Sequence, residues 1–126
     1  MNQIKKEIKE NLREIRTDIA KNTADAQFYF PSNFIGFKGH FPDNPILPGI
    51  CIVEALLVKL MIWQERPVRL KEMRNIKFFS PVRPDQILMF ESKIEQEADS
   101  LFYIVNSKVT SDDRKIAQLK LEISVN

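Results

Sequence analysis

The sequence predicts an α+β fold in which an antiparallel sheet wraps around one long central helix, and three observations favour it. Residues 50–64 are apolar on nearly every side and contain no proline or glycine, which is typical of a helix surrounded by protein. Strand patterns dominate from Met73 to the C-terminus. Residues 117–125 alternate between apolar and polar side chains, as in a strand with one buried face. The central helix is therefore expected at about residues 48–64.

Length and composition fit one domain. The chain has 126 residues, of which 44% are hydrophobic and 29% charged, which is enough for one core and too short for two. Residues 1–126 are therefore expected to form one domain that includes an amphipathic N-terminal segment at residues 1–25. The net charge of +2 comes from scattered basic residues, so the sequence predicts no nucleic-acid partner.

The sequence also bears on compartment and membrane contact. The single cysteine, Cys51, excludes an internal disulfide, and with one histidine in the chain it cannot build a zinc site. Residues 1–16 are rich in Lys and Glu and lack the apolar core of a signal peptide. The apolar run at residues 50–63 is too short to span a membrane. We expect a cytoplasmic protein with no membrane span.

The other elements are assigned from local patterns. Apolar residues at positions 4, 8, 12, 15 and 19 fit one face of a helix, but residues 12–20 fit a first strand as well. An aromatic-rich strand is expected between residues 26 and 37, with a break at Pro31. After the helix we expect an antiparallel meander, with a turn at residues 111–113 and strands at residues 76–79, 87–94, 101–109 and 116–125. Trp63 should close the far end of the helix against this sheet, and the aromatic residues should belong to the core or to an interface.

Two polar residues stand where burial is costly. Glu54 lies inside the apolar helix, where desolvation favours a protonated carboxyl that can donate a proton. His40 exchanges protons near neutral pH and lies in a loop, residues 39–49, that three prolines make stiff and irregular. The helix N-terminus at Gly49 offers free amides for a carbonyl oxygen. An acid, a base and oxyanion donors together suit proton abstraction next to a thioester carbonyl with loss of a β-hydroxyl as water.

These residues also carry a family resemblance. The runs His40-Phe41-Pro42, Pro45-Ile46-Leu47-Pro48-Gly49 and Glu54-Ala55-Leu56 resemble the signature of the β-hydroxyacyl-acyl carrier protein dehydratases, the FabZ-like family of the hotdog fold. The interval of 14 residues from His40 to Glu54 matches the family spacing, and residues 79–86 resemble its second motif, a proline-bounded turn. The chain resembles a divergent member that is short at its N-terminus.

The resemblance implies roles for individual residues. His40 would remove the α-proton, and Glu54 of a partner subunit would protonate the departing hydroxyl. The Gly49 amide would hold the thioester carbonyl, while Phe41, Pro48 and Val58 would contact the substrate. No metal or organic cofactor is implied.

The resemblance also implies partners. These are an acyl carrier protein with a phosphopantetheine-linked substrate and a second copy of the chain, in a homodimer, a dimer of dimers or a trimer of dimers. The pathway would be fatty-acid-type or specialised lipid or polyene biosynthesis. The acyl chain would enter an apolar tunnel near the dimer interface, and basic residues at the mouth of this tunnel would bind the carrier protein. The candidates are Lys38, Arg66, Arg69, Lys71, Arg74, Lys77 and Arg83.

Other functions remain open from the sequence alone. The same fold hosts acyl thioesterases and hydratases, because a fold does not determine its chemistry. A non-catalytic subunit that binds acyl carrier protein is a third interpretation. It is kept open by Asp43 and Val58, which replace the glycine and glutamine usual in the family.

Overall fold

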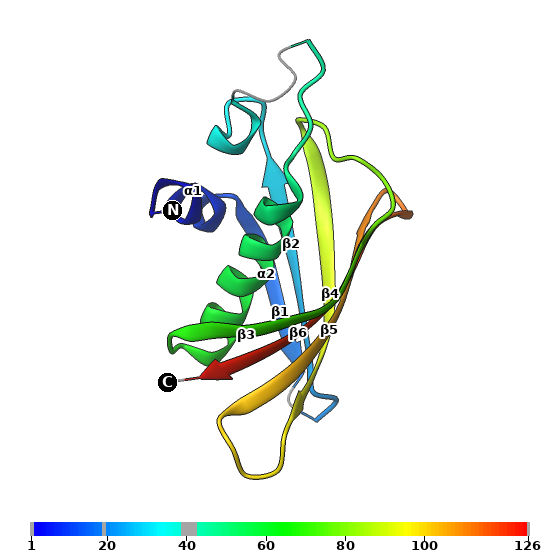
Figure 1. Ribbon diagram of the computed structural model, residues 1–126. Helices are drawn as coiled ribbons and strands as arrows, with labels where there is room; N and C mark the ends of the chain where they lie inside the picture. The colour runs from blue at the N-terminus through cyan, green and yellow to red at the C-terminus, as the bar shows by residue number, and fades with distance from the viewer. Residues whose placement is uncertain (1, 19, 39–42, 126) are drawn as a thin grey trace.

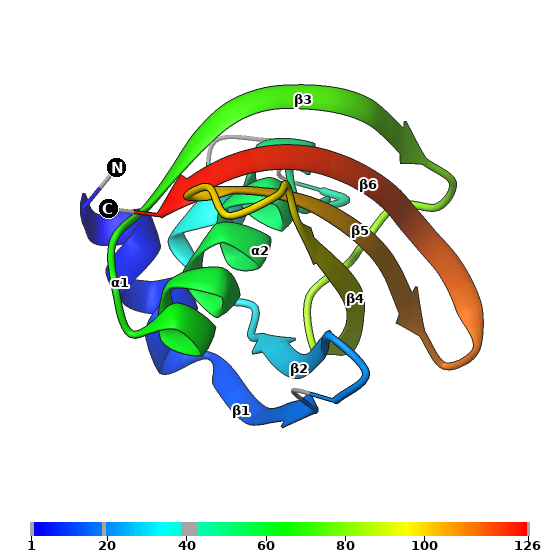
Figure 2. The ribbon, with the colours of Figure 1, turned by 90° about the horizontal axis from the view of Figure 1, so that it is seen from below.

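One antiparallel sheet wraps around a central helix in the computed structural model, which describes residues 2–18, 20–38 and 43–125. Helix α2 (Gly49–Gln64) runs along the concave face of the sheet (Figure 1). Viewed from below in Figure 2, the sheet curves over α2 and helix α1 (Asn2–Glu10) lies at the open side. The predicted α+β fold is confirmed, and α2 starts one residue after the predicted boundary because Pro48 is its N-cap.

Six strands form the sheet within the described residues, in the order β1-β2-β4-β5-β6-β3. Their bounds are β1 Leu12–Asp18, β2 Thr23–Phe30, β3 Val68–Phe78, β4 Gln86–Gln96, β5 Phe102–Ser111 and β6 Arg114–Val125. The predicted meander is right for β4, β5 and β6 and wrong for β3. That strand pairs with β6 at the far edge, because α2 carries the chain across the sheet after β2.

The N-terminal stretch contains both a helix and a strand. The helical periodicity holds as far as Glu10, and Ile8 is fully buried. From Leu12 onward the strand interpretation is correct, because pairing with β2 provides the backbone with regular hydrogen-bond partners. Ile19, the last residue of the predicted helical pattern, lies outside the described residues.

Aromatic side chains fill one end of the core. Phe28, Phe30, Phe34 and Phe37 are at most 5% exposed and pack on one another in sequence, as predicted. At the far end of α2, Trp63 meets the ring of Tyr103 edge-on with centroids 5.7 Å apart, which confirms its predicted position. By contrast, Phe78 and Phe79 are 51% and 48% exposed and are not core residues of this chain.

One stripe of α2 remains uncovered within this chain. Ile50 is 53% exposed, and Glu54, Leu57 and Met61 are half-buried. Their spacings of four, three and four residues place them on one helix face. The prediction that the sheet buries every face of this helix is therefore wrong for this stripe, because the wrapped sheet leaves one side open. No helix in the described ranges is long and apolar enough to cross a membrane.

Candidate active site at the start of helix α2

The first turn of α2 presents uncapped amides. Pro48 is the N-cap residue, has an extended backbone and makes no side-chain capping hydrogen bond. The first amides of a helix have no intrahelical acceptor, and the helix dipole adds partial positive charge there. This end of α2 can therefore polarise a carbonyl oxygen, as expected from the sequence.

Gly49 lies directly under an aromatic ring. A Cβ atom at this position would lie 2.7 Å from Cζ of Phe78, so a side chain here would collide with the ring. Both residues line a cavity of about 400 Å³, together with Ile46, Leu47, Ile52, Phe79, Ser80, Pro81 and Val82. The lining is mainly apolar, and the helix N-terminus is part of its wall. Such a cavity suits the carbonyl end of an acyl chain.

Residues 43–49, from the first motif, lie against residues 79–86, the second motif. The amide of Leu47 donates to the carbonyl of Val82 at 2.8 Å, and the Arg83 guanidinium donates to Oδ1 of Asn44. Asp85, which has a left-handed backbone with φ 66°, fixes the far end of the second segment. Its amide donates to the Phe30 carbonyl at 2.7 Å, and its carboxylate accepts from the Tyr29 hydroxyl at 2.7 Å.

Residues on both sides of the stretch 39–42 lie close to this helix end. A Cβ at Gly36, in the 3-10 helix η1 (Ile35–Phe37), would lie 2.9 Å from Sγ of Cys51, so η1 packs against the first turn of α2. Helix α1 holds η1 in place, because the Ile35 amide donates to Oε1 of Glu7 at 3.0 Å. Beyond the stretch, Leu47 is bound to the neighbouring loop. The predicted site residues His40 and Phe41 themselves lie outside the described residues.

Glu54 is half-buried with an unpartnered carboxylate oxygen. Its Oε2 atom is inaccessible to solvent and has no hydrogen-bond partner in the described part of the chain. Burial raises the pKa of the nearby Cys51 thiol to about 11, and the negative charge of Glu54 adds to this effect. The thiol is therefore a buried, unreactive group, as predicted. A buried polar atom without a partner is uncommon and calls for a ligand, a water or a second chain.

The remaining predicted contacts fall on the same helix. Val58 follows Glu54 by four residues and is fully buried, so it lies on the same helix face one turn further on. Pro48 is half-buried at the helix start. The structure thus brings Gly49, the cavity and the two motif segments together at one end of α2, with Glu54 and Val58 further along the helix.

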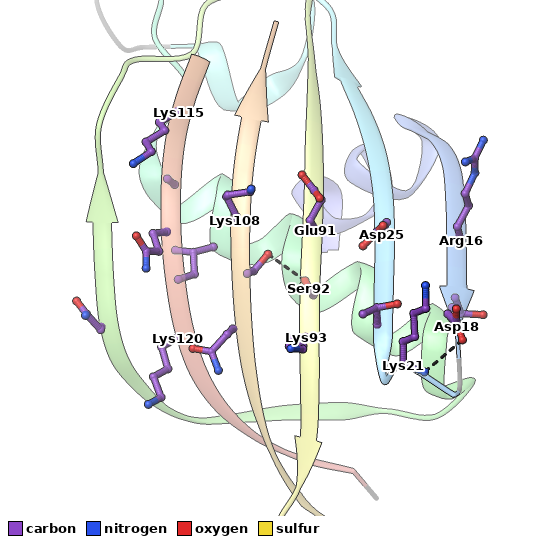
Figure 3. A pocket seen from close by; sticks show the side chains of 18 of the residues that line it. Arg16, Asp18, Lys21, Asp25, Glu91, Ser92, Lys93, Lys108, Lys115 and Lys120 are labelled. Carbon is purple, nitrogen blue, oxygen red and sulfur yellow. Dashed lines mark hydrogen bonds between the residues drawn. The ribbon is translucent and has the colours of Figure 1, made fainter. Parts of the chain in front are cut away.

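A larger hollow lies elsewhere and is not this site. It measures about 850 Å³ on the outer face of the sheet, where Asp25 and Glu91 lie on neighbouring strands beside Lys93, Lys108 and Lys120 (Figure 3). Pro48, Gly49, Glu54 and Val58 do not line it, and it shares only Phe79 with the cavity beside Gly49. A charged outer face is usual for an antiparallel sheet with one solvated side.

Two features of the helix surroundings were not predicted from the sequence. Lys59 is fully buried and donates a hydrogen bond to Ser92. Phe78 lies over Gly49, a contact that depends on where β3 ends. For Lys59 the signal was present, since a lysine amid apolar helix residues needs a polar partner.

Comparisons with known proteins agree with this arrangement. A family model described as ApeI dehydratase, of the ApeI-like family, matches residues 16–120. The 3-hydroxyacyl-acyl-carrier-protein dehydratase FabZ of Brucella abortus strain S19 is 33% identical over 99 residues, which cover 71% of this chain and 62% of the relative. FabZ of Fusobacterium nucleatum is 30% identical over 87 residues, covering 65% of this chain and 61% of the relative. The chain thus spans about three fifths of the length of these curated relatives.

Solved structures share the fold. The dehydratase heterocomplex ApeI:P from Xenorhabdus doucetiae superposes with a TM-score of 0.75 and 19% identity, covering 90% of this chain and 96% of that chain. A hypothetical thioesterase with coenzyme A from Streptococcus pneumoniae TIGR4 gives a TM-score of 0.70 at 10% identity, covering 93% of this chain and 87% of that chain.

A sheet wrapped around one helix, shared with dehydratases and thioesterases, defines the class as the hotdog fold. The chain belongs to the ApeI-like dehydratase family, and its similarity to FabZ confirms the resemblance inferred from the sequence.

Proposed function

We propose that this protein removes water from a 3-hydroxyacyl thioester to give the 2-enoyl thioester. The observation that carries the proposal is the buried carboxylate oxygen of Glu54, which has no hydrogen-bond partner among the described residues. The same helix offers free amides at Gly49. Family membership supports the same chemistry. Dehydration needs an acid for the leaving hydroxyl, a base for the α-proton and donors for the carbonyl oxygen.

Each step has a proposed residue. His40 accepts the proton from the α-carbon, and the electron pair of that C–H bond forms the new double bond as the β-carbon–oxygen bond breaks. Glu54 gives its proton to the departing oxygen, which leaves as water. The Gly49 amide stabilises the charge on the thioester oxygen. His40 then returns the abstracted proton to Glu54 through solvent, which restores both groups.

The substrate would enter the cavity beside Gly49. Its apolar wall supports a fatty acyl substrate, with Phe41, Pro48 and Val58 proposed as further contacts. The curated relatives are named for substrates on an acyl carrier protein, and we propose the same carrier here. Lys38, Lys77 and Arg83 are exposed and close in sequence to the cavity-forming segments, so they suit an acidic carrier. The reduced Cys51 is compatible with a cytoplasmic location.

We infer that the working unit contains two hotdog subunits. Strand β3 lies at the edge of the sheet with one side unpaired, and the exposed side chains of Met73 and Phe78 lie on it. The open stripe of α2 carries Glu54 between Ile50 and Leu57. A second copy of this chain that continued the sheet at β3 would bury these apolar groups. The similar ApeI:P structure is titled a heterocomplex, so a different hotdog partner is the alternative outcome.

The decisive experiment measures turnover of 3-hydroxyacyl carrier-protein thioesters by mass spectrometry. Wild type should lose water from the substrate, and His40→Ala and Glu54→Gln should abolish this loss while keeping the oligomeric state. Glu95→Gln, at an exposed carboxylate on β4, is the matched control and should retain full activity. If the substrate is instead hydrolysed to the free acid, the protein is a thioesterase and the dehydratase proposal is wrong. Carrier-protein binding without turnover would favour a non-catalytic subunit, the interpretation that Asp43 and Val58 keep open.

A further inference from the structure

A buried polar cluster joins α2 to the middle of the sheet. Lys59 is fully buried, and its Nζ donates to Oγ of Ser92 on β4 at 2.5 Å. The Ser92 hydroxyl donates in turn to Oγ of Ser107 on β5 at 2.9 Å, the bond drawn from Ser92 in Figure 3. We call Lys59, Ser92 and Ser107 the Lys59 cluster. It connects the helix to two adjacent central strands.

No carboxylate forms an ion pair with this amine among the described residues. The acidic groups that act on Lys59 are Asp25 on β2 and Glu91 on β4, and neither is bonded to it. The polar group that β5 provides is the Ser107 hydroxyl, and the neighbours of Lys59 on α2, Val58 and Leu60, are apolar. Burial lowers the pKa of the amine to about 7, against the opposing effect of the two acids. Among the described residues, the hydrogen-bond partner of the amine is therefore the Ser92 hydroxyl, which Ser107 supports in turn.

The rest of α2 offers little to define its rotation. Cys51, Ile52, Val53, Ala55 and Leu56 are all buried and apolar. The hydrophobic effect has no direction, so apolar contacts define the rotation of a helix less sharply than a buried hydrogen bond does. A single buried polar contact can select one register, because other registers leave the polar group unpaired.

The cluster and the catalytic face lie on different sides of the helix. Lys59 follows Glu54 by five residues, which corresponds to a rotation of about 140° and a rise of about 7.5 Å. Lys59 thus faces the sheet, while Glu54 lies on the stripe that the sheet leaves open. Any turn of α2 about its axis would displace both Glu54 and the Gly49 amide.

We propose that the Lys59 cluster sets the rotation and axial position of α2 against β4 and β5, and that Lys59 is thereby a positioning residue for Glu54 and the Gly49 amide. The structural part of this inference stands by itself, and its consequence for catalysis rests on the proposed function. A displacement of about 1 Å in a reacting group can cost a hundredfold in rate.

A matched pair of substitutions tests the cluster. Ser92→Thr keeps the hydroxyl, and Ser92→Val has nearly the same shape without it. We expect Ser92→Thr to keep wild-type turnover, and Ser92→Val to lower kcat about tenfold or more with KM changed less than about twofold. Lys59→Met should behave like Ser92→Val. Lys93→Met, at an exposed lysine on the same strand, should behave like wild type.

A second readout does not depend on activity. Trp63 is the single tryptophan, lies one turn after Lys59 and packs on Tyr103 of β5, so its fluorescence reports the position of α2 against that strand. Ser92→Val should change its emission maximum and speed hydrogen exchange in α2, relative to Ser92→Thr. If Ser92→Val and Ser92→Thr have the same emission maximum, hydrogen-exchange rate in α2 and kcat, the proposal is wrong. If wild type shows no turnover, the proposed function fails, and emission and exchange alone decide the inference.

Discussion

Cys51 illustrates how burial and a nearby negative charge make a thiol unreactive. The thiol is 1% exposed, and burial together with the Glu54 charge raises its pKa from 9.0 to about 11. Only the thiolate attacks disulfide reagents, so near neutral pH the shift reduces the reactive fraction about a hundredfold. We predict that a chromogenic disulfide reagent modifies the folded protein at least about a hundredfold more slowly than the urea-unfolded chain. Equal rates in the two states would contradict this prediction.

Lys59 should give the protein an unusual pH dependence of stability. Burial lowers the pKa of its amine from the ordinary 10.5 to about 7 in the folded protein. Between these values the unfolded chain binds more protons, so the free energy of unfolding rises with pH. The penalty of the buried charge is complete below pH 7 and declines above it. We predict a rise of up to about 2 kcal/mol between pH 7 and 9, measured by urea unfolding.

The variant Lys59→Met is the test of that assignment. It should be more stable than wild type at pH 7. Its free energy of unfolding should not rise between pH 7 and 9, because no amine remains to titrate. The comparison ends near pH 9, since the raised pKa of Cys51 lowers stability as pH rises further. A wild-type slope that persists in Lys59→Met would assign the pH dependence to another group.

At the residue scale, the sequence was most informative where chemistry is local. Glu54 was proposed as a site residue because a carboxylate in an apolar helix is costly, and Gly49 because it lies at a helix N-terminus and has no side chain. The ring of Phe78 over Gly49 could not be predicted, since it requires β3 to end beside α2. The partners of Lys59 lie 33 and 48 residues away in sequence, so their pairing depends on sheet register.

At the element scale, the start of α2 should depend on the fit between Gly49 and Phe78. A Cβ on residue 49 would come within 2.7 Å of the Phe78 ring. We predict that Gly49→Ala lowers the free energy of unfolding by about 0.5 to 1.5 kcal/mol, because the half-exposed ring must leave its present rotamer. In a Phe78→Ala background the same substitution should be nearly neutral. Urea unfolding of the four proteins gives the coupling energy, and strictly additive effects would show that the ring does not limit this position.

One element that the sequence left open and one that it misassigned share a physical cause. Residues 12–18 carry a helical spacing of apolar residues but become β1, because β2 offers a complete hydrogen-bonding edge. Strand β3 was expected within a meander but pairs with β6. In both cases the choice of partner strand determined the outcome, and periodicity carries no information about partners. Strand β6 was predictable because alternating apolar and polar residues identify a half-buried strand without knowledge of its partner.

At the scale of the whole molecule, the exposed apolar groups gather where a second subunit would fit. Strand β3 is the edge strand on one side of the sheet. The α2 stripe of Ile50, Glu54, Leu57 and Met61 lies on the side of the helix that the sheet does not cover. Long unpaired edge strands are usually protected in stable proteins. The proposed assembly of two subunits would cover both features. The exposed charged side chains of β1, at the opposite edge, make that strand a poor site for pairing.

Met73 provides the sharpest test of that assembly. It is 51% exposed on the edge strand β3 and pairs in register with the buried Leu121, so its side chain lies on the concave side of the sheet. We predict that Met73→Lys weakens self-association at least about tenfold, because a charge would be buried at the interface. Analytical ultracentrifugation over a concentration series measures this. Ile87→Lys is the matched control, since Ile87 is 52% exposed on the central strand β4 and gains the same charge. If both variants associate like wild type, β3 is not the contact. If wild type is monomeric until a second hotdog chain is added, the variants Met73→Lys and Ile87→Lys test the heterodimer in the same way.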